Sequence, residues 1–143
     1  MQNYHNLIYR EEEREMIPYC HDTGVGLIPW SPIARGVLAR PYGSRGETTR
    51  DKTDKFLNNL YRQQELEADK AVITRVEEVA KKKDVSMTAV ATAWSLYKGC
   101  NPIIGLSSKE RIDEAVKNIH VKLTEGEIKY LEEPYVPKVK VGY

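Results

Sequence analysis

Two short, uninterrupted apolar runs most constrain what this chain can fold into: residues 26–30 (GLIPW) and residues 102–106 (PIIGL). Each run is followed by turn-forming or polar residues, which is typical of a strand buried on both faces of a sheet. Helical patterns separate the two runs, so we expect parallel strands. A third strand is expected to end within residues 1–9. This order fits two architectures, a doubly wound sheet and a (β/α)8 barrel.

Helical patterns account for much of the remaining chain. Residues 11–22 begin with a cluster of acids and contain Pro18, which predicts a short or kinked helix. Residues 70–83 carry one apolar stripe of helical spacing. Ser86 is placed to cap the next helix, and Gly99 is placed to end it.

Two capping-box sequences predict two further helices near the C-terminus. Residues 107–110 (SSKE) form the first and residues 124–127 (TEGE) the second. Between the strand expected at residues 26–30 and the helix expected at 70–83 lies an irregular stretch, residues 31–68, which is rich in glycine, proline and charge. A connection of that length in a compact domain is usually functional or mobile. The first capping box precedes an apolar stripe of Ile112, Ala115, Val116 and Ile119.

Composition excludes several classes of protein. The chain has 143 residues, 22 Lys and Arg against 21 Asp and Glu, and a net charge of +1, so we expect no nucleic-acid partner. No apolar run approaches the roughly 20 residues that span a bilayer, so we expect no membrane partner. The N-terminus lacks the pattern of a signal peptide, and two cysteines make no disulfide framework. We therefore expect a cytoplasmic protein. No His or Cys spacing predicts a metal site.

Polar side chains follow the first two expected strands, at the end where ligands bind in parallel α/β proteins. Gln2 offers a donor and an acceptor that suit a carboxamide, although a solvent-facing amide is the commoner interpretation. Trp30 suits stacking on a planar ring. Ser31, Arg35 and the backbone N–H groups between them suit a pyrophosphate. A core Trp followed by a Ser-Pro turn explains the same residues equally well.

The strand expected at residues 102–106 leads into a candidate phosphate site. Gly105 permits close approach of the backbone to a ligand, and the helix that follows offers free N–H groups and a positive dipole end. Ser107 and Arg111 suit a phosphate, and Glu114, one turn further, suits an amino or hydroxyl group. The competing interpretation makes Ser107 an N-cap and Arg111 a surface charge, and spacing alone favours it. Together the three positions match a dinucleotide at the C-terminal rim of a barrel.

Longer blocks of this sequence resemble the aldo-keto reductase family, and within it the fungal aryl-alcohol dehydrogenase branch. The resemblance runs over essentially the whole chain and is most specific around the Trp-Ser-Pro block. The matching blocks are residues 2–7, 10–13, 26–36 and 102–105, together with Ser107 and Arg111.

The resemblance implies a (β/α)8 barrel that binds NADP(H) and reduces aldehydes or ketones by hydride transfer. It implies that Gln2 holds the nicotinamide carboxamide and that Trp30 stacks under the nicotinamide ring. It implies that Glu114 contacts the adenine, where Ala115 replaces the asparagine usual in the family. The adenosine 2'-phosphate is then held by Gly105, Ser107 and Arg111. The pyrophosphate is lined by Ser31, Pro32, Ile33, Ala34 and Arg35, with Arg40 or Arg45 from the long loop.

The chain is too short to form the whole barrel that the resemblance implies. A barrel of this type needs about 250 residues, so residues 1–143 are expected to form one incomplete domain, about the last three βα units. The family's catalytic Asp, Tyr, Lys and His have no matching position here. We therefore expect the isolated chain to lack turnover with a small carbonyl or alcohol substrate. The alternative is a non-enzymatic remnant or half-barrel that binds nucleotide and associates through open sheet edges, with itself or with a complementing N-terminal half.

Overall fold

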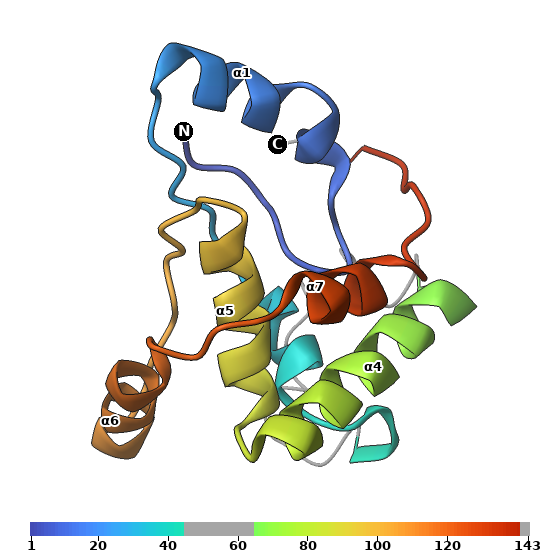
Figure 1. Ribbon diagram of the computed structural model, residues 1–143, viewed down its shortest axis with the longest axis vertical. Helices are drawn as coiled ribbons and strands as arrows, with labels where there is room; N and C mark the ends of the chain where they lie inside the picture. The colour runs from blue at the N-terminus through green and yellow to red at the C-terminus, as the bar shows by residue number, and fades with distance from the viewer. Residues whose placement is uncertain (45–64, 141–143) are drawn as a thin grey trace.

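The computed structural model describes residues 1–44 and 65–140, and these form helices around three extended segments (Figure 1). No helix in that part of the chain combines the length and the apolarity needed to cross a membrane. The elements, in order, are the 3-10 helix η1 (Glu11–Arg14), α1 (Met16–Thr23), the 3-10 helices η2 (Ala34–Ala39) and η3 (Tyr42–Ser44), α4 (Glu67–Lys83), α5 (Met87–Tyr97), α6 (Lys109–Asn118) and α7 (Glu125–Glu132).

Three extended segments lie side by side in parallel, in the order 1–4, 27–30 and 101–103. Isolated parallel bridges join Tyr4 to Trp30 and Trp30 to Ile103. The Trp30 amide donates to the Asn3 carbonyl at 3.0 Å, and the Ile103 amide donates to the Pro29 carbonyl at 2.8 Å. The expected parallel order is therefore confirmed.

The expectation of regular strands at 26–30 and 102–106 is wrong, because the described residues contain isolated bridges and no continuous strand. Proline explains much of the difference. Pro29 lies in the middle segment and has no N–H to donate toward the third segment. The ladder between the middle and third segments is thus interrupted at Pro29, where a regular strand needs a donor.

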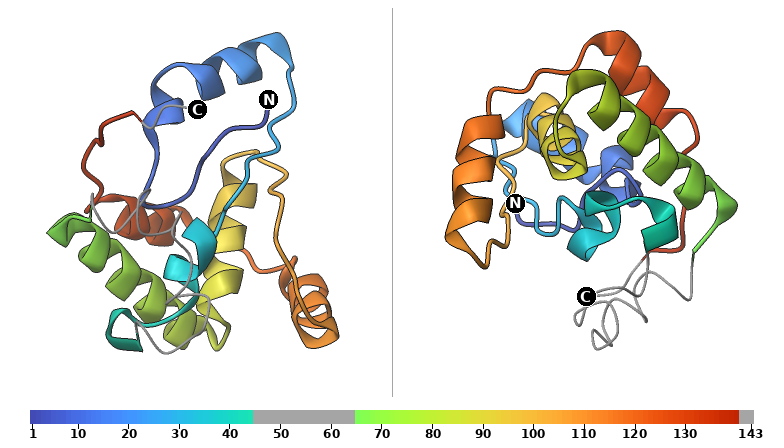
Figure 2. Two further views of the ribbon diagram at one scale, coloured as in Figure 1. Left: turned by 180° about the vertical axis from the view of Figure 1, so that it is seen from behind. Right: turned by 90° about the horizontal axis from the view of Figure 1, so that it is seen from below.

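The hydrophobic core lies among α4, α5, α7 and η2. Helix α4 packs against α5 and α7, and both α4 and α5 pack against η2. Trp94, Val90 and Ile73 are fully buried in it. A second, smaller cluster lies between α1 and the extended segments and contains Ile17, Cys20, Leu27 and Cys100. Figures 1 and 2 show that α6 stands apart from this body, and none of its residues is buried.

Local signals set the helix ends. The Ser86 hydroxyl accepts from the Ala89 amide at 3.2 Å, which confirms the predicted N-cap of α5. Gly99 has φ of +76° just after that helix, a conformation that glycine adopts without a Cβ penalty. The Thr124–Glu127 capping box is also confirmed, since each side chain bonds the other residue's amide.

The predicted helix over 11–22 is divided into η1 and α1. The break falls at Glu15, whose φ of −142° is not helical. Pro18 then lies in the first turn of α1, where its missing N–H would have no intrahelical partner in any case. The short or kinked helix expected from Pro18 is therefore confirmed.

A partly buried ionic network ties the N-terminal segment to α5 and α7. Arg10 donates to Glu13 (Nη2 to Oε2, 2.7 Å) and to Glu132 (3.0 Å). His5 is fully buried, and its Nε2 lies 2.9 Å from Glu13 Oε1. Trp94 Nε1 donates to Glu132 at 2.8 Å. These contacts fix residues 1–13, and therefore the first extended segment, against the helical core.

Candidate cofactor-binding site

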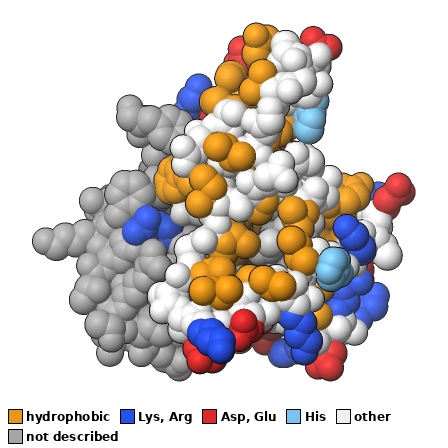
Figure 3. Space-filling model, turned by 90° about the vertical axis from the view of Figure 1, so that its left-hand side faces the viewer, with side chains coloured by type: hydrophobic (Ala, Val, Ile, Leu, Met, Phe, Trp, Pro, Cys, Tyr) orange, Lys and Arg blue, Asp and Glu red, His pale blue; other side chains and the backbone are white. Residues whose placement is uncertain are grey.

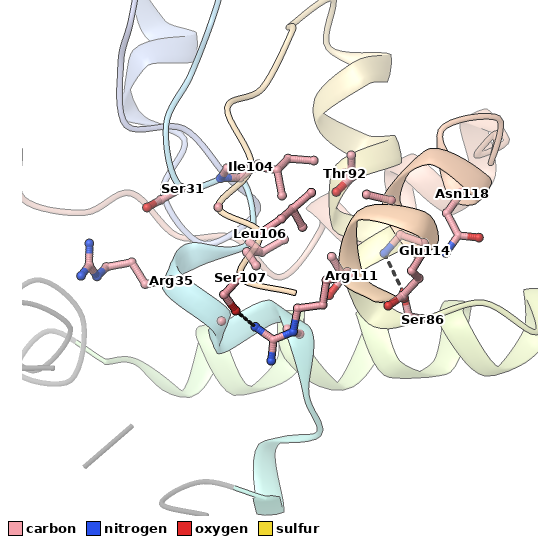
Figure 4. A pocket seen from close by; sticks show the side chains of 18 of the residues that line it. Ser31, Arg35, Ser86, Thr92, Ile104, Leu106, Ser107, Arg111, Glu114 and Asn118 are labelled. Atoms are coloured by element: carbon pink, nitrogen blue, oxygen red, sulfur yellow. Dashed lines mark hydrogen bonds between the residues drawn. The ribbon is translucent and has the colours of Figure 1, made fainter. Parts of the chain in front are cut away.

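A cavity of about 650 Å³ lies between the turn after the middle segment, the start of α5, residues 103–107 and α6 (Figure 4). Elements far apart in the sequence therefore meet at one site. Most of the residues predicted from the sequence line it, namely Ser31, Pro32, Ile33, Arg35, Arg40, Gly105, Ser107, Arg111 and Glu114.

Ser107 and Arg111 form the most defined polar pair of the cavity. Arg111 Nη1 donates to the Ser107 hydroxyl at 3.1 Å, drawn as a dashed line in Figure 4. The interpretation of Ser107 as an N-cap is wrong, because Ser108 caps α6 and accepts from the Arg111 amide at 3.4 Å. The Ser107 hydroxyl and the remaining guanidinium N–H groups thus face the cavity beside a helix N-terminus, an arrangement that suits an anion.

The turn after the middle segment has an uncommon backbone. Ser31, Ala34 and Arg35 have φ of 54°, 47° and 55°, and Gly36 has φ of 100°. For non-glycine residues this conformation costs on the order of 1 kcal/mol each, and it persists where surrounding contacts hold it. The Asn6 side chain does so by donating to the Ser31 carbonyl at 3.1 Å. The turn is therefore held in one shape before any ligand binds.

Ala34 is the one residue of the expected 31–35 pyrophosphate stretch that does not line the cavity. Only 1% of it is exposed, and it packs into the hydrophobic core. Its methyl group anchors the turn while its backbone gives the turn its shape. Sequence spacing places Ala34 beside Arg35 but does not reveal that the two side chains face opposite ways, because that depends on their positive φ values.

Gln2 and Trp30 also lie outside the cavity lining. Trp30 is half-buried and stacks on Tyr4, with ring centroids 4.5 Å apart. The bridge between Tyr4 and Trp30 places their side chains on one face of the parallel segments, and the two-residue period of extended chain places Gln2 on that face too. The two residues predicted for the nicotinamide end therefore share a surface with each other and adjoin the cavity through Ser31.

The two arginines of the loop differ from Arg111 in setting. Arg35 and Arg40 line the cavity, but Figure 4 shows the Arg35 guanidinium directed away from the Ser107–Arg111 pair. Arg45 lies outside the described residues. In the cavity, the Arg111 guanidinium is therefore hydrogen-bonded to the Ser107 hydroxyl, while Arg35 and Arg40 lie at the border.

Sequence reasoning missed the opposite wall of the cavity. This wall is lined by Ser86, Thr88 and Thr92 at the start of α5 and by Asn118 of α6, one turn beyond Glu114. The signal was available in part, since Thr88 and Thr92 lie four residues apart on the polar side of an otherwise apolar helix. Only the packing of α5 against η2 shows that this polar side borders a cavity.

A second group of chemically capable side chains does not form a site. His5 Nδ1 lies 4.0 Å from the Cys100 sulfur and His5 Nε2 lies 2.9 Å from Glu13. This order of groups is the one that activates a nucleophilic thiol. Here burial raises the pKa of the Cys100 thiol to about 11, and the Glu13 charge raises it further than Lys98 lowers it. The thiol is therefore protonated near neutral pH and inaccessible, so the group is structural.

Comparison with known protein families gives one clear match. A sequence model of the group described as "Aldo/keto reductase family" matches residues 1–135. The chain is 65% identical over 139 residues to versiconal hemiacetal acetate reductase of Aspergillus parasiticus, across 96% of this chain and 40% of that protein. It is 59% identical to a putative aryl-alcohol dehydrogenase of Schizosaccharomyces pombe, across 96% of this chain and 41% of that protein. The chain thus spans about 40% of the length of these relatives.

Solved structures match at the level of the fold. A thermostable aldo-keto reductase crystallised with epalrestat aligns with a TM-score of 0.66 and 23% identity, over 93% of this chain and 38% of that one. A glycerol dehydrogenase of Gluconobacter oxydans aligns with a TM-score of 0.71 and 22% identity, over 99% of this chain and 44% of that one. The arrangement of segments and helices described above is therefore that of part of such a fold.

Proposed function

This chain belongs to the aldo/keto reductase family, and we propose that its cavity binds the adenosine and pyrophosphate end of NADP(H), for the reduction of aldehydes or ketones. The observation that carries the proposal is the hydrogen bond from Arg111 to Ser107 at the start of α6. It holds a cation and a hydroxyl together on the cavity wall before any ligand is present. A phosphate is the ligand that such a pair, beside a helix N-terminus, binds best.

The rest of the cavity suits the remaining parts of the same ligand. Glu114 offers a carboxylate to the adenine amino group, one turn along α6 from Arg111. The fixed turn at Ser31, with Arg35 and Arg40 at its border, suits the pyrophosphate. The preference for NADP(H) over NAD(H) rests on Arg111, because only NADP(H) carries the 2'-phosphate.

The nicotinamide end belongs on the face shared by Gln2 and Trp30. The half-exposed ring of Trp30 offers a stacking surface, and the Gln2 amide offers both a donor and an acceptor for the carboxamide. When bound, the cofactor supplies the hydride that reduces the carbonyl. The residues of this chain bind and orient it there.

We expect this chain by itself to bind the cofactor without turning over substrate. Reduction of a carbonyl needs a proton donor at the carbonyl oxygen. Tyr4 lies beside Trp30, but burial raises its pKa to about 12 and only 3% of the residue is exposed. It neither reaches a substrate nor releases a proton readily near neutral pH. Activity on a carbonyl or alcohol substrate then requires residues outside the part of the chain described here.

The test is a titration of the purified chain with NADPH and NADH, for wild type, Arg111→Ala and Lys117→Ala. Lys117→Ala is the matched control, because it removes a cation from the same helix at a position outside the cavity. We expect Arg111→Ala to weaken NADPH binding about tenfold or more, since a charge-assisted hydrogen bond contributes about 1.5–3 kcal/mol. NADH binding and the control should change little. Equal binding of both cofactors by wild type and Arg111→Ala would refute the assignment of the phosphate site.

A second candidate function is a nucleotide-binding remnant without any redox role, and the open edges of the parallel segments favour it. The two functions differ in one measurement. A mixture of this chain and the rest of a relative's barrel that oxidises NADPH with an aromatic aldehyde supports the reductase. Saturable cofactor binding, without oxidation in that mixture, supports the remnant.

A further inference from the structure

Two polar side chains in the interior have no oxygen or nitrogen partner among the described residues. Asn3 is only 2% exposed, and both the oxygen and the nitrogen of its side-chain amide are unpartnered. The hydroxyl of Ser95, in α5, is fully buried and unpartnered as well. Hydrophobic side chains on the surface, such as those in Figure 3, are common in proteins. A buried amide without a hydrogen bond is rare, because its burial then destabilises the fold.

Asn3 faces the helical core and not the surface proposed for the nicotinamide. The bridge between Tyr4 and Trp30 places those two rings on one face of the parallel segments. The two-residue period of extended chain therefore turns Asn3 and His5 to the opposite face. The position of the His5 ring agrees with this direction, since it lies 4.9 Å from the ring of Trp94 in α5. Asn3 thus lies on the side of the first segment that α5 covers.

Ser95 approaches the same region from α5. The Cys100 amide donates to the Ser95 carbonyl at 3.2 Å. Burial raises the pKa of the Cys100 thiol, and the Ser95 hydroxyl beside the sulfur lowers it to a smaller extent. The same sulfur lies 4.0 Å from His5 Nδ1. Ser95 and His5 therefore meet around Cys100, on the side of the segment that carries Asn3. Because sulfur is a weak hydrogen-bonding partner, it leaves both groups in need of a stronger one.

The mixture of donors and acceptors in this region indicates which ligand fits it. His5 Nε2 lies 2.9 Å from the Glu13 carboxylate, which only accepts, so Nδ1 is an acceptor in the neutral ring. The Asn3 amide adds a donor and an acceptor, and the Ser95 hydroxyl can act as either. A metal ion needs acceptors alone, and an anion needs donors alone. Water both donates and accepts, and a buried water molecule requires two to four such partners.

We propose that an internal water molecule bridges the Asn3 side chain and the Ser95 hydroxyl, and so ties the first extended segment to α5. The bridge satisfies polar atoms that the described residues leave unpartnered. It also fixes the backbone between Gln2 and Tyr4, because Asn3 lies between them in sequence. This inference concerns the interior of the chain and does not depend on cofactor binding.

The direct test locates the water in the wild-type chain. A high-resolution crystal structure should show one water at about 2.7–3.2 Å from both the Asn3 amide and the Ser95 hydroxyl. In solution, NMR should show a nuclear Overhauser effect between water and the Asn3 side-chain NH2 protons, with the sign of a long-lived complex. The exposed side chain of Asn101 is the control and should show only short-lived surface water. A direct bond between Asn3 and Ser95, or no water at either group, overturns the proposal.

A double-mutant cycle tests whether the two side chains act through one bridge. Asn3→Leu keeps nearly the same volume without polar atoms, and Ser95→Ala removes the hydroxyl. Each single variant takes one partner from the water and leaves the other group unsatisfied, whereas the double variant removes both groups. The unfolding constant of the double variant, from chemical denaturation, should therefore be at least about threefold smaller than the product of the two single effects predicts. Agreement with that product overturns the bridge.

Ser86→Ala is the matched control for the cycle. It removes a hydroxyl from the opposite end of α5, roughly 13 Å from Ser95 at 1.5 Å per residue. Loss of this N-cap is measurable, and its effect should combine with that of Asn3→Leu as a simple product. The crystallographic and NMR measurements use the wild-type chain, so they decide the matter if a core variant does not fold.

Discussion

The ring of Tyr4 stacks on the ring of Trp30, with centroids 4.5 Å apart and planes inclined by 27°. Tyr9 in turn lies against Tyr4, with centroids 4.7 Å apart. Tyr4 therefore covers one face of the indole and is itself held from behind. The stack therefore restrains the orientation of the Trp30 ring, so a ligand ring that meets Trp30 meets a side chain already held in place.

Tryptophan fluorescence can report NADPH binding, because a nicotinamide ring stacked on Trp30 should quench it. Replacement of Trp30 tests whether the quenching comes from that ring. The other tryptophan, Trp94, is fully buried and donates to Glu132, so quenching by NADPH should come from Trp30. Trp30→Phe should lose the quenching yet keep affinity within a few-fold in calorimetry, because phenylalanine still stacks. Trp30→Ala should bind about three- to tenfold more weakly. Quenching that survives in Trp30→Phe would place the nicotinamide elsewhere.

The partly buried network at Glu13 makes the stability of the fold depend on pH in acid. Burial alone would raise the pKa of this carboxyl, but hydrogen bonds from His5 and Arg10 and the charges of Arg10 and Lys98 hold it well below the ordinary value. Because the folded pKa lies below the unfolded pKa of about 4.3, this stabilisation is present above that pH and is lost as the pH falls further.

Glu13→Gln should therefore lower the free energy of unfolding by about 1–3 kcal/mol at pH 7, the usual worth of hydrogen bonds to charged groups. The difference from wild type should shrink steadily below about pH 4. Chemical denaturation at a series of pH values measures it. Glu125→Gln, at an exposed position in the first turn of α7, serves as the control. A difference that stays constant down to pH 2 would contradict the assigned ionisation of Glu13.

The thiol of Cys100 should resist alkylation in the folded protein. With a pKa of about 11, roughly one thiol in a thousand is ionised at pH 8, and only 3% of the residue is exposed. Iodoacetamide labelling, followed by peptide mass spectrometry, should proceed at least a hundredfold more slowly than in denaturant. Rapid labelling of native Cys100 would show that the Cys100, His5 and Glu13 group is reactive after all.

Gly99→Ala should destabilise the junction between α5 and the third extended segment. Its φ of +76° costs about 1–2 kcal/mol for alanine, and the new Cβ would meet His21 Cε1 at 2.9 Å. The His21 ring is the end of an exposed side chain and can move aside, so the backbone should carry most of the cost. Thermal melts of Gly99→Ala with and without His21→Ala should therefore agree closely. A large rescue by His21→Ala would assign the cost to the clash instead.

Local signals predicted the helices well because their causes lie within a few residues. The caps at Ser86 and at Thr124–Glu127 act across one turn, and the expected helix over 70–83 differs from α4 only by starting at Glu67. The extra turn begins where the Asp69 carboxylate accepts from the Leu66 amide at 3.0 Å. The cap of α6 differed by one residue, since two adjacent serines offer equal chemistry and only the backbone decides between them.

The sequence predicted most of the residues that line the candidate site, but it did not predict how they are arranged in space. Ser107, Arg111 and Glu114 share one helix start, so their proximity follows from helical spacing. Their meeting with Ser31 and Arg40 depends on contacts across some 60 residues or more, which no local pattern specifies. Their meeting with Thr92 depends on how α5 packs beside α6, which no local pattern specifies either. Trp30 shows the limit most clearly, because its neighbour Ser31 lines the cavity while its own ring faces Tyr4.

By itself, the sequence determined the order of segments, the caps at Ser86 and Thr124 and the family to which the chain belongs, because capping, periodicity and motif are properties of neighbouring residues. Tertiary structure alone decided that Ala34 anchors the core, that Cys100 beside His5 is buried and protonated, and that the Ile112 stripe of α6 has no described partner. The physical reason is common to all three. Burial, pKa and exposure depend on which distant segments pack together, and that packing is settled only when the whole chain closes around its core.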